Sequence, residues 1–357
     1  MCPILAMSFC VLVGSLAPDS TVAFYEVSPR GCTLCSQSPA FGPSPSFLAL
    51  SPDSSTAYAA NHDVPAPGLT AVAAATRTPL QPLVAVPDPC HVAVHPSGRW
   101  VLSASYSDGS VTVLPVLGPG GLLGAPTTTA LGRNAHQAAL WGGGEEVLVP
   151  LLGSDAVAVL AFDAASGALA LRQTLALPAG SGPRHIAFHP SNPSRAYLAC
   201  ELASSVVPLT RSAGGAWAAE LGAAQSTLRP GLPVAAVQAC AAIALAPDGA
   251  FLYVSNRAAP SPAGDNSIAV LALAADGALA GPPVSWAVGG EGSAALNFPR
   301  DFALSPDGAL LVAASQRSGS LTVFTRSADT GALAFVSTDP VPAVASPSSV
   351  LFTRLAL

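Results

Sequence analysis

The chain has 357 residues, half of them hydrophobic and only 10% charged, so it can bury the core of two ordinary domains or of one large all-β domain. Its net charge of −6 combines 20 acidic residues with 14 basic residues, all of them arginine, and the absence of a basic patch argues against a nucleic-acid binder. Seven scattered cysteines form no disulfide framework, which favours a reducing compartment.

The N-terminal segment 3–16 is apolar but lacks the basic residues that precede the hydrophobic region of a signal peptide. It runs directly into STVAFYEV (20–27), which alternates as a strand does, so we expect strands here and no cleaved presequence. No window reaches 18 uninterrupted apolar residues, so we expect no membrane span and take the cytosol as the compartment. Cys32 and Cys35 have redox-motif spacing without a βαβ context, and we expect ordinary packing cysteines.

One unit recurs along the rest of the chain: an apolar strand, a tight turn, a second strand and then a third. Its turn prolines are separated by 44, 94, 57 and 59 residues, the second interval covering two units; they are Pro52, Pro96, Pro190, Pro247 and Pro306. A period of this size with four strands per unit is typical of a β-propeller. We predict an all-β fold, a seven-bladed β-propeller with four antiparallel strands in each blade.

Six units are contiguous, and the seventh is split between the two ends of the chain. The expected units are 44–85, 90–130, 134–178, 184–232, 239–290, 297–340, and 346–357 together with 3–38. Pairing the terminal strands in one blade closes the ring and removes exposed strand edges. We therefore expect residues 1–357 to form a single propeller domain. A closed ring needs no partner to cover its edges, so no particular oligomeric state is predicted.

Polar residues stand at corresponding points of the units. The innermost strand of a blade lines the central channel, and the loop leading into it shares a face with the loop between the second and third strands. The starts of the inner strands carry His91, His136, Arg184, His185 and Arg300. The second-to-third strand loops carry His62, Tyr106, Glu201, Asn256, Arg257 and Gln316. We expect these residues to converge at one mouth of the channel, and we place His95 and His189 in turns on the opposite face.

This set suits an anionic small molecule, because guanidinium groups bind carboxylate or phosphate bidentately. Histidine and glutamate offer general acid/base groups, which together with a cation can open a lactone. No G-x-S-x-G nucleophile motif occurs, and no metal or cofactor is expected. Two alternatives remain open: Arg184, Glu201 and Arg257 could form only a salt bridge between blades, and His62 and His91 could stabilise blades instead of contacting substrate.

Three stretches carry a family resemblance: GPRH followed by CEL, SNR before DNSIAV, and NFPRDFALSPDG before SQRSGSLTVF. They resemble the seven-bladed propeller lactonase family, which includes bacterial-type 6-phosphogluconolactonases and fungal carboxymuconate-cyclizing enzymes. The resemblance covers essentially the whole chain. It implies hydrolysis of 6-phospho-D-glucono-1,5-lactone to 6-phospho-D-gluconate in the pentose phosphate pathway. The site residues that it implies are His136, Arg184, Glu201 and Arg257.

The chain also departs from the family pattern, with Ser105 and Ser315 in place of a frequent asparagine and Asn134 in place of a frequent histidine. We expect Glu201 or His185 to activate water and His136 to assist the leaving oxygen. The residues expected to bind the anionic substrate are Arg184, Arg257, Arg300, His91, Asn256 and Gln316. A muconate-type cycloisomerase acting on a dicarboxylate and a non-catalytic propeller scaffold are the alternative functions.

Overall fold

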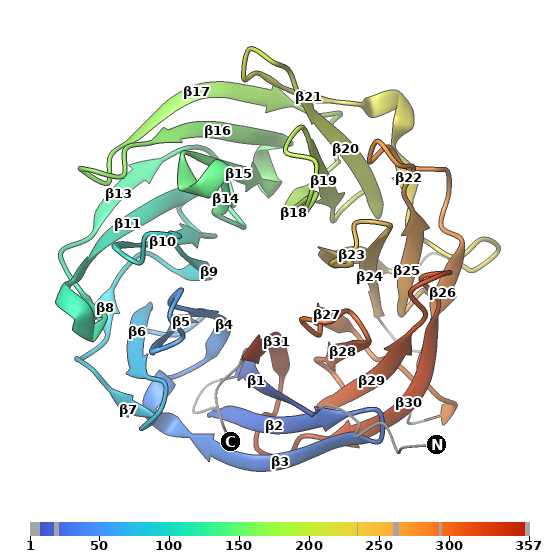
Figure 1. Cartoon of the computed structure of the whole chain (residues 1–357), viewed down its shortest axis with the longest axis horizontal. Helices are drawn as coiled ribbons and strands as arrows, with labels where there is room; N and C mark the ends of the chain where they lie inside the picture. Colours follow the sequence, from blue (N-terminus) through green and yellow to red (C-terminus); the bar gives the residue numbers. More distant parts are fainter. Residues whose placement is uncertain (1–7, 18–20, 234, 260–263, 293–294, 354–357) are drawn as a thin grey trace.

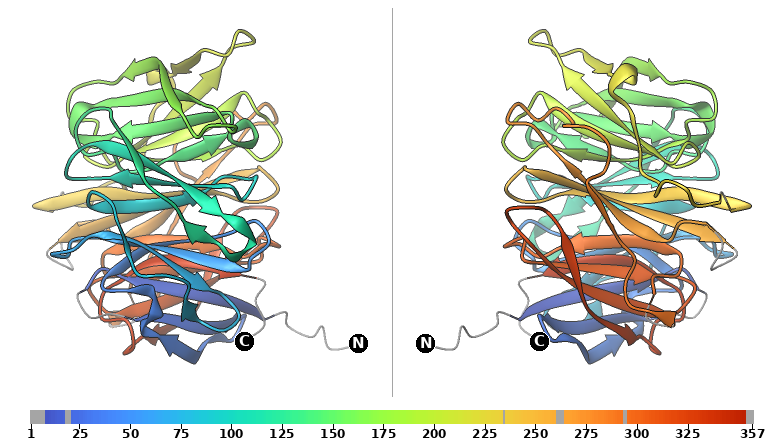
Figure 2. Two further views of the ribbon diagram at one scale, coloured as in Figure 1. Left: turned by 90° about the vertical axis from the view of Figure 1, so that its left-hand side faces the viewer. Right: turned by 90° about the vertical axis from the view of Figure 1, so that its right-hand side faces the viewer.

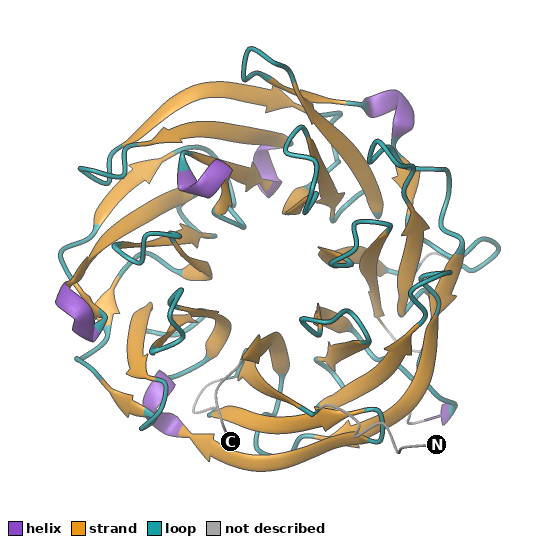
Figure 3. Cartoon of the chain, viewed as in Figure 1, coloured by secondary structure: helices purple, strands orange, loops and turns teal. Residues whose placement is uncertain are grey.

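The computed structural model describes residues 8–17, 21–233, 235–259, 264–292 and 295–353. These residues form seven antiparallel sheets arranged as blades around a central axis (Figure 1). Almost all regular structure is strand, with a few single turns of 3-10 helix between strands (Figure 3). The predicted all-β, seven-bladed propeller is confirmed. No helix among the described residues has the length and apolar character needed to span a membrane.

Each blade has four strands in order from the channel outwards, and three blades add a short fifth strand. Blade 1 contains β31 (Pro347–Thr353), β1 (Phe9–Ser15), β2 (Val22–Ser28) and β3 (Gly31–Ser38). Blade 2 contains β4 (Pro45–Leu50), β5 (Thr56–Asn61), β6 (Gly68–Ala73), β7 (Thr78–Pro79) and β8 (Val84–Ala85). Blade 3 contains β9 (Pro89–Val94), β10 (Trp100–Ser105), β11 (Ser110–Leu117), β12 (Leu122–Leu123) and β13 (Thr127–Ala130).

The remaining four blades follow in chain order. Blade 4 contains β14 (Ala139–Trp141), β15 (Glu146–Leu151), β16 (Ala156–Phe162) and β17 (Leu169–Ala176). Blade 5 contains β18 (Pro183–Phe188), β19 (Arg195–Cys200), β20 (Ser205–Arg211), β21 (Trp217–Ala219) and β22 (Gln225–Ser226). Blade 6 contains β23 (Val237–Leu245), β24 (Phe251–Ala259), β25 (Ser267–Ala272) and β26 (Ser285–Ala287). Blade 7 contains β27 (Pro299–Leu304), β28 (Leu310–Ser315), β29 (Ser320–Arg326) and β30 (Leu333–Pro340). The 3-10 turns are η1 (Pro39–Phe41), η2 (Gly118–Gly120), η3 (Gly142–Gly144), η4 (Leu152–Ser154) and η5 (Leu221–Ala223).

Blade 1 closes the ring, because its inner strand β31 comes from the C-terminal part of the chain and pairs antiparallel with β1. The register joins Cys10 to Thr353 and Val13 to Val350. This pairing closes the ring, as the sequence predicted. Residues 3–7, 18–20 and 354–357 of the expected split unit lie outside the described residues, so a single domain spanning 1–357 stays a prediction.

The core lies between neighbouring blades, where strands are buried on both faces. Val11 and Val13 of blade 1, for example, pack in one cluster with Leu310 and Val312 of blade 7. Strands buried on both sides need apolar residues at successive positions, which explains runs such as FCVLVGS. Seen from the side, β23 and β24 reach beyond their neighbours on one face of the ring (Figure 2).

The face opposite the predicted mouth is held by aromatic side chains that donate to a carbonyl of the next blade. Buried phenol and indole groups need such a partner, and here the turn of the adjacent blade supplies it. The contacts are Tyr58 to Gly121, Trp100 to Ala164, Trp141 to Pro193, Tyr197 to Gly277 and Tyr253 to Gly331. These contacts join consecutive blades from blade 2 to blade 7.

The two cysteines on β3, Cys32 and Cys35, lie in different environments. Cys32 faces blade 7, where its thiol lies 3.2 Å from an oxygen of Asp339, and burial raises its pKa. Cys35 is exposed and falls in a β-bulge, because Leu34 pairs with Tyr25 and Ser36 with Phe24. The expectation of two packing cysteines is therefore wrong for Cys35. The bulge leaves it out of the ladder.

Candidate active site

Five inner strands begin at a proline and then bulge, and the bulge decides which side chain enters the channel. These prolines are Pro45, Pro89, Pro183, Pro299 and Pro347. A proline is tolerated at the first residue of a strand, and the register then slips by one residue after it. The bulged residues are Ser46, Cys90, Arg184, Arg300 and Ser348, and all five line one small cavity deep in the channel. Two of five equivalent positions therefore carry arginine.

Glu201 stands between two arginines from different blades. It follows β19 directly, and its backbone N–H donates to Gly182 at 2.7 Å, beside the start of β18. Its Oε2 lies 2.8 Å from Nε of Arg184, and its Oε1 lies 2.8 Å from Nη2 of Arg257. The Arg184 Nε–H makes no aligned hydrogen bond, so this contact is an ion pair only. The carboxylate keeps 17% exposure, whereas both arginines are buried.

Arg300 is the third guanidinium of the cluster. No hydrogen bond or ion pair joins its side chain to another of the described residues, although Arg184 and Arg257 are close enough to affect it. Burial, followed by repulsion from those two arginines, lowers its pKa to about 9. A positive charge placed beside two others is costly unless an anion is nearby. Arg300 therefore adds a positive charge to the channel that no described residue pairs with.

Two histidines lie beneath the arginines. The ring centroids of His136 and His185 are 5.0 Å apart, and both side chains are buried. Burial, reinforced by the charge of Arg184, holds both pKa values well below the ordinary 6.5, so the imidazoles are neutral at pH 7. His136 Nδ1 and His185 Nε2 have no hydrogen-bond partner among the described residues. Both rings keep hydrogen-bonding capacity that the protein does not use.

Two cavities meet at the arginine cluster. The mouth cavity, of about 200 Å³, is lined by Leu16, His62, Cys90, Tyr106, His136, Glu201, Arg257 and Arg300. The second lobe, of about 360 Å³, is lined by Glu201, Val237, Ala239, Arg257, Phe298, Arg300, Gln316, Arg317 and Ser346. Glu201, Arg257 and Arg300 belong to both. The small cavity below, of about 10 Å³, also contains His136 and Arg300, together with His185.

Two predicted substrate contacts are turned into the protein. His91 stacks on Phe47 at 4.4 Å between centroids, and its Nδ1 accepts a long 3.5 Å hydrogen bond from the Ala138 N–H of the next blade. Burial and Arg184 lower its pKa to about 3. Asn256 is fully buried, donates to the Thr227 carbonyl at 2.7 Å and accepts from its hydroxyl at 2.6 Å. Their contacts make both residues braces between parts of the fold.

Some residues around the cavities were not among the predicted site residues. Asp301 accepts from the Val350 N–H at 2.8 Å, and burial raises its pKa to about 6. Asp301 and Phe298 flank Arg300 in NFPRDF, and Arg317 follows Gln316. Their position next to predicted site residues is the sequence feature that could have identified them. The open question about His62 is partly answered, since it lines the mouth while its Nδ1 lies 2.7 Å from Asp88.

Other parts of the described chain offer less chemistry. A hollow of about 470 Å³ lies between the outer turns of blades 2 and 3, but its two charged residues are already engaged. Asp53 accepts from Ser51 and Ser55, and Arg99 donates to Ala164 at 2.6 Å. Within the described residues, no three His, Cys, Asp or Glu side chains are grouped to hold a metal ion.

The sequence matches one known family over most of its length. Residues 12–352 match the family described as "Lactonase, 7-bladed beta-propeller". The chain belongs to this family. The lactonase is 32% identical over 279 residues to the 6-phosphogluconolactonase of Bacillus subtilis, covering 73% of this chain and 72% of that protein. It is also 32% identical to the 6-phosphogluconolactonase of Erwinia tasmaniensis over 69% of each chain.

The fold of the lactonase agrees with solved structures as well. The crystal structure of a Lactobacillus plantarum protein superposes with a TM-score of 0.84 at 28% identity, covering 98% of this chain and all of that one. The expected membership of the propeller lactonases is thus confirmed. The four residues that the family resemblance implied, His136, Arg184, Glu201 and Arg257, line the three adjoining channel cavities.

Proposed function

We propose that this lactonase hydrolyses 6-phospho-D-glucono-1,5-lactone to 6-phospho-D-gluconate, with Glu201 activating water in the arginine-lined mouth. The observation that carries the proposal is the Arg184–Glu201–Arg257 cluster beside Arg300, whose guanidinium has no partner among the described residues. The names of the Bacillus subtilis and Erwinia tasmaniensis relatives support the same substrate. We further propose that the reaction belongs to the pentose phosphate pathway and takes place in the cytosol.

The charge balance of the site suits this substrate. Three guanidiniums face one another, against the carboxylate of Glu201 and the more deeply placed Asp301. A phosphate group can accept paired hydrogen bonds from guanidinium, which is the strongest form of such contact. The substrate anion would therefore offset the repulsion between Arg257, Arg184 and Arg300.

Glu201 is better placed than His185 to act as the base. Glu201 lines both the mouth cavity and the second lobe, whereas His185 lines the small cavity below, where there is little room for water and substrate. A substrate anion that engages Arg257 weakens one of the two ion pairs on Glu201. Oε1 of Glu201, which otherwise faces Arg257, is then free to accept a hydrogen bond from the attacking water.

The reaction is balanced by one proton transfer in each direction. Glu201 takes a proton from water as the water oxygen attacks the lactone carbonyl carbon, and Arg300 stabilises the oxyanion that forms. The bond from that carbon to the ring oxygen then breaks, and the protonated Glu201 returns its proton to the ring oxygen. His136, neutral at pH 7, assists by donating a hydrogen bond to this oxygen. Water is consumed and an acid is produced.

A direct assay tests the proposal. Purified protein should accelerate hydrolysis of the phosphorylated lactone above its spontaneous rate, and more strongly than hydrolysis of unphosphorylated gluconolactone. A muconate dicarboxylate, offered in parallel, should give no cyclised product. Hydrolysis of the phosphorylated lactone at the spontaneous rate would overturn the proposal.

A further inference from the structure

The second lobe contains the one exposed arginine of the site, Arg317. This residue and Gln316 follow β28, and their backbone N–H groups donate to Asn297 and Phe298 across the loop. The lobe has a volume of about 360 Å³, within the range of roughly 300 to 1,000 Å³ found for small-molecule pockets. It adjoins the catalytic groups because Glu201, Arg257 and Arg300 line it too.

Phe298 holds two arginines around the lobe. The guanidinium carbon of Arg317 lies 4.6 Å from the centre of the Phe298 ring, and that of Arg257 lies 5.1 Å from it. Contact with the ring face favours each cation, but it does not cancel the repulsion between them. An anion between the two guanidiniums would do so. The lobe therefore presents two positive groups on one aromatic support.

The support itself is rigidly built. Phe298 has a φ of 61°, a left-handed conformation that is costly for a bulky side chain. Asn266 stabilises it by accepting hydrogen bonds from the N–H groups of Phe298 and Ala258, both at 2.9 Å. Ala258 follows Arg257 directly, so one amide side chain fixes both the ring and the backbone beside the arginine.

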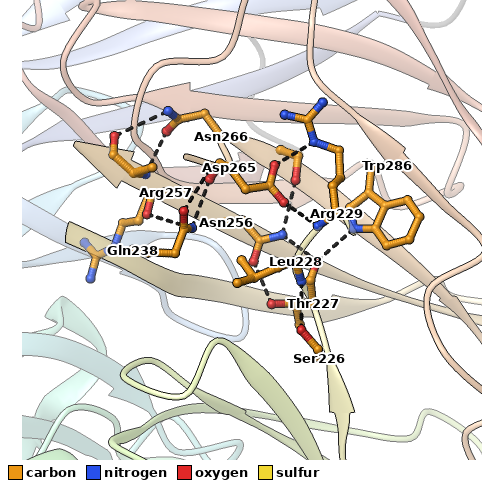
Figure 4. A network of polar contacts seen from close by, with 12 residues as sticks. Ser226, Thr227, Leu228, Arg229, Gln238, Asn256, Arg257, Asp265, Asn266 and Trp286 are labelled. Atoms are coloured by element: carbon orange, nitrogen blue, oxygen red, sulfur yellow. Dashed lines mark hydrogen bonds and ion pairs between the residues drawn. The ribbon is translucent and has the colours of Figure 1, made fainter. Parts of the chain in front are cut away.

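Asn266 is anchored in turn by a polar network (Figure 4). Its neighbour Asp265 accepts from the backbone N–H and the Nε–H of Arg229, both at 2.8 Å. Gln238 accepts from the Asp265 N–H at 2.8 Å and donates to its carbonyl at 3.1 Å. The chain that follows Arg257 is thus tied back to β23 before β25 begins. This network preorganises the second lobe for a ligand.

We propose that the second lobe binds the phosphate group of the substrate and that Arg317 determines the preference for phosphorylated over unphosphorylated lactones. The inference rests on the proposed function. In the lactone, the carbonyl carbon C1 and the carbon that carries the phosphorylated C6 flank the ring oxygen, so the two groups are neighbours that can occupy two adjoining cavities. His136 and Tyr106 face the mouth cavity, whereas Arg317 and Gln316 face the second lobe, and Glu201 lies where the two meet.

The test compares Arg317→Gln with a matched control, Arg77→Gln. Arg77 of blade 2 lies with its guanidinium carbon 4.4 Å from the centre of the Phe24 ring of blade 1. Replacing it therefore removes the same kind of cation–ring contact, but away from the channel. We expect Arg317→Gln to lower the ratio of kcat/KM for phosphorylated to unphosphorylated gluconolactone by about tenfold to a hundredfold, mainly through KM, since a hydrogen bond to a charged group is lost. Arg77→Gln should leave both rates unchanged.

A binding measurement separates this inference from the proposed function. Calorimetric titration with 6-phosphogluconate and with gluconate should show tighter binding of the phosphorylated acid by the unmodified protein, and Arg317→Gln should remove that preference. This result would support phosphate binding in the second lobe even if neither lactone were hydrolysed. Active enzyme whose rate ratio and binding preference both survive Arg317→Gln would overturn the inference and leave the proposed function standing.

Discussion

Charged residues are paired differently on the two faces of the ring. On the face opposite the mouth, Glu146 accepts from Arg211 Nε and Nη2 at 3.3 and 3.0 Å and from Trp217 Nε1 at 3.1 Å, so its carboxylate is fully used. At the mouth, Glu201 also joins two blades, but it lies beside a third guanidinium, Arg300, that has no partner among the described residues. Both glutamates bridge blades. Only the second belongs to a cluster with excess positive charge.

The histidines show the same difference. His95 Nδ1 bonds to the Ser97 hydroxyl at 2.8 Å, and His189 Nε2 lies 3.2 Å from the Gly249 carbonyl, both in turns away from the mouth as predicted. His136 and His185 each keep a buried nitrogen without a partner within the described part of the chain. Buried polar groups are usually satisfied in native proteins, so a concentration of exceptions indicates a functional site.

The largest expected effect comes from Glu201→Gln, which keeps the shape of the side chain and removes its basicity. We expect kcat/KM for the phosphorylated lactone to fall a hundredfold or more, as is usual for loss of a general base. Glu146→Gln is the control from the opposite face and should retain the full rate. Steady-state kinetics of the two variants measure the effect. An equal loss of rate in both would show that Glu201 has no catalytic role that Glu146 lacks.

Arg300→Met should separate binding from stability. Without this cation we expect affinity for 6-phosphogluconate to fall at least tenfold, while the free energy of unfolding rises by up to about 1 kcal/mol because the repulsion from Arg184 and Arg257 is relieved. Arg326→Met is the counterpart on the far face, where Arg326 bonds to Asp248 at 2.5 Å and Tyr253 at 2.8 Å. That variant should bind normally and unfold more easily. Calorimetric titration and urea unfolding measure both quantities; a destabilised Arg300→Met would contradict the prediction.

Glu146→Gln should affect stability only. The change weakens hydrogen bonds to Arg211 and Trp217 in a buried setting, and we expect unfolding to become easier by about 1 to 3 kcal/mol. The matched change Glu201→Gln should lower the free energy of unfolding by less, because the contact of Glu201 with Arg184 Nε is an ion pair without an aligned hydrogen bond. Urea titrations of the two proteins provide the comparison, and the reverse order of stabilities would show that the mouth is the more strongly bonded face.

Acid should destabilise the protein through its buried histidines. The pKa of His91 is about 3 and those of His136 and His185 lie well below 6.5, so the unfolded chain binds protons below pH 6.5 that the folded protein does not. Stability should therefore fall as pH drops below about 6.5, by about 1.4 kcal/mol per unit for each imidazole. Asp301, whose pKa is raised to about 6, opposes this between pH 6 and 4. Urea unfolding at pH 5, 6 and 7 measures the slope, and a constant stability over this range would exclude neutral buried imidazoles.

Much of the site could be predicted because position within a repeat determines which face a residue occupies. Glu201, Arg184 and Arg257 come from two blades and were expected at one mouth, where the structure brings them together. His91 and Asn256 occupy corresponding positions, yet their side chains bond to Ala138 and Thr227. The repeat pattern could not separate these cases, since it specifies the end of a strand and not the direction of a side chain there.

The sequence by itself determined the propeller, the pairing of its ends and the face on which the polar residues gather, because apolar strands recur along the whole chain and five of the seven units mark the same turn with a proline. Only the tertiary structure decided that the residue after each inner-strand proline turns into the channel, that Glu201 is shared by two arginines and that Arg300 is left without a partner among the described residues. These features depend on strand register and on the adjacent blade, so they arise only when distant segments pack against one another.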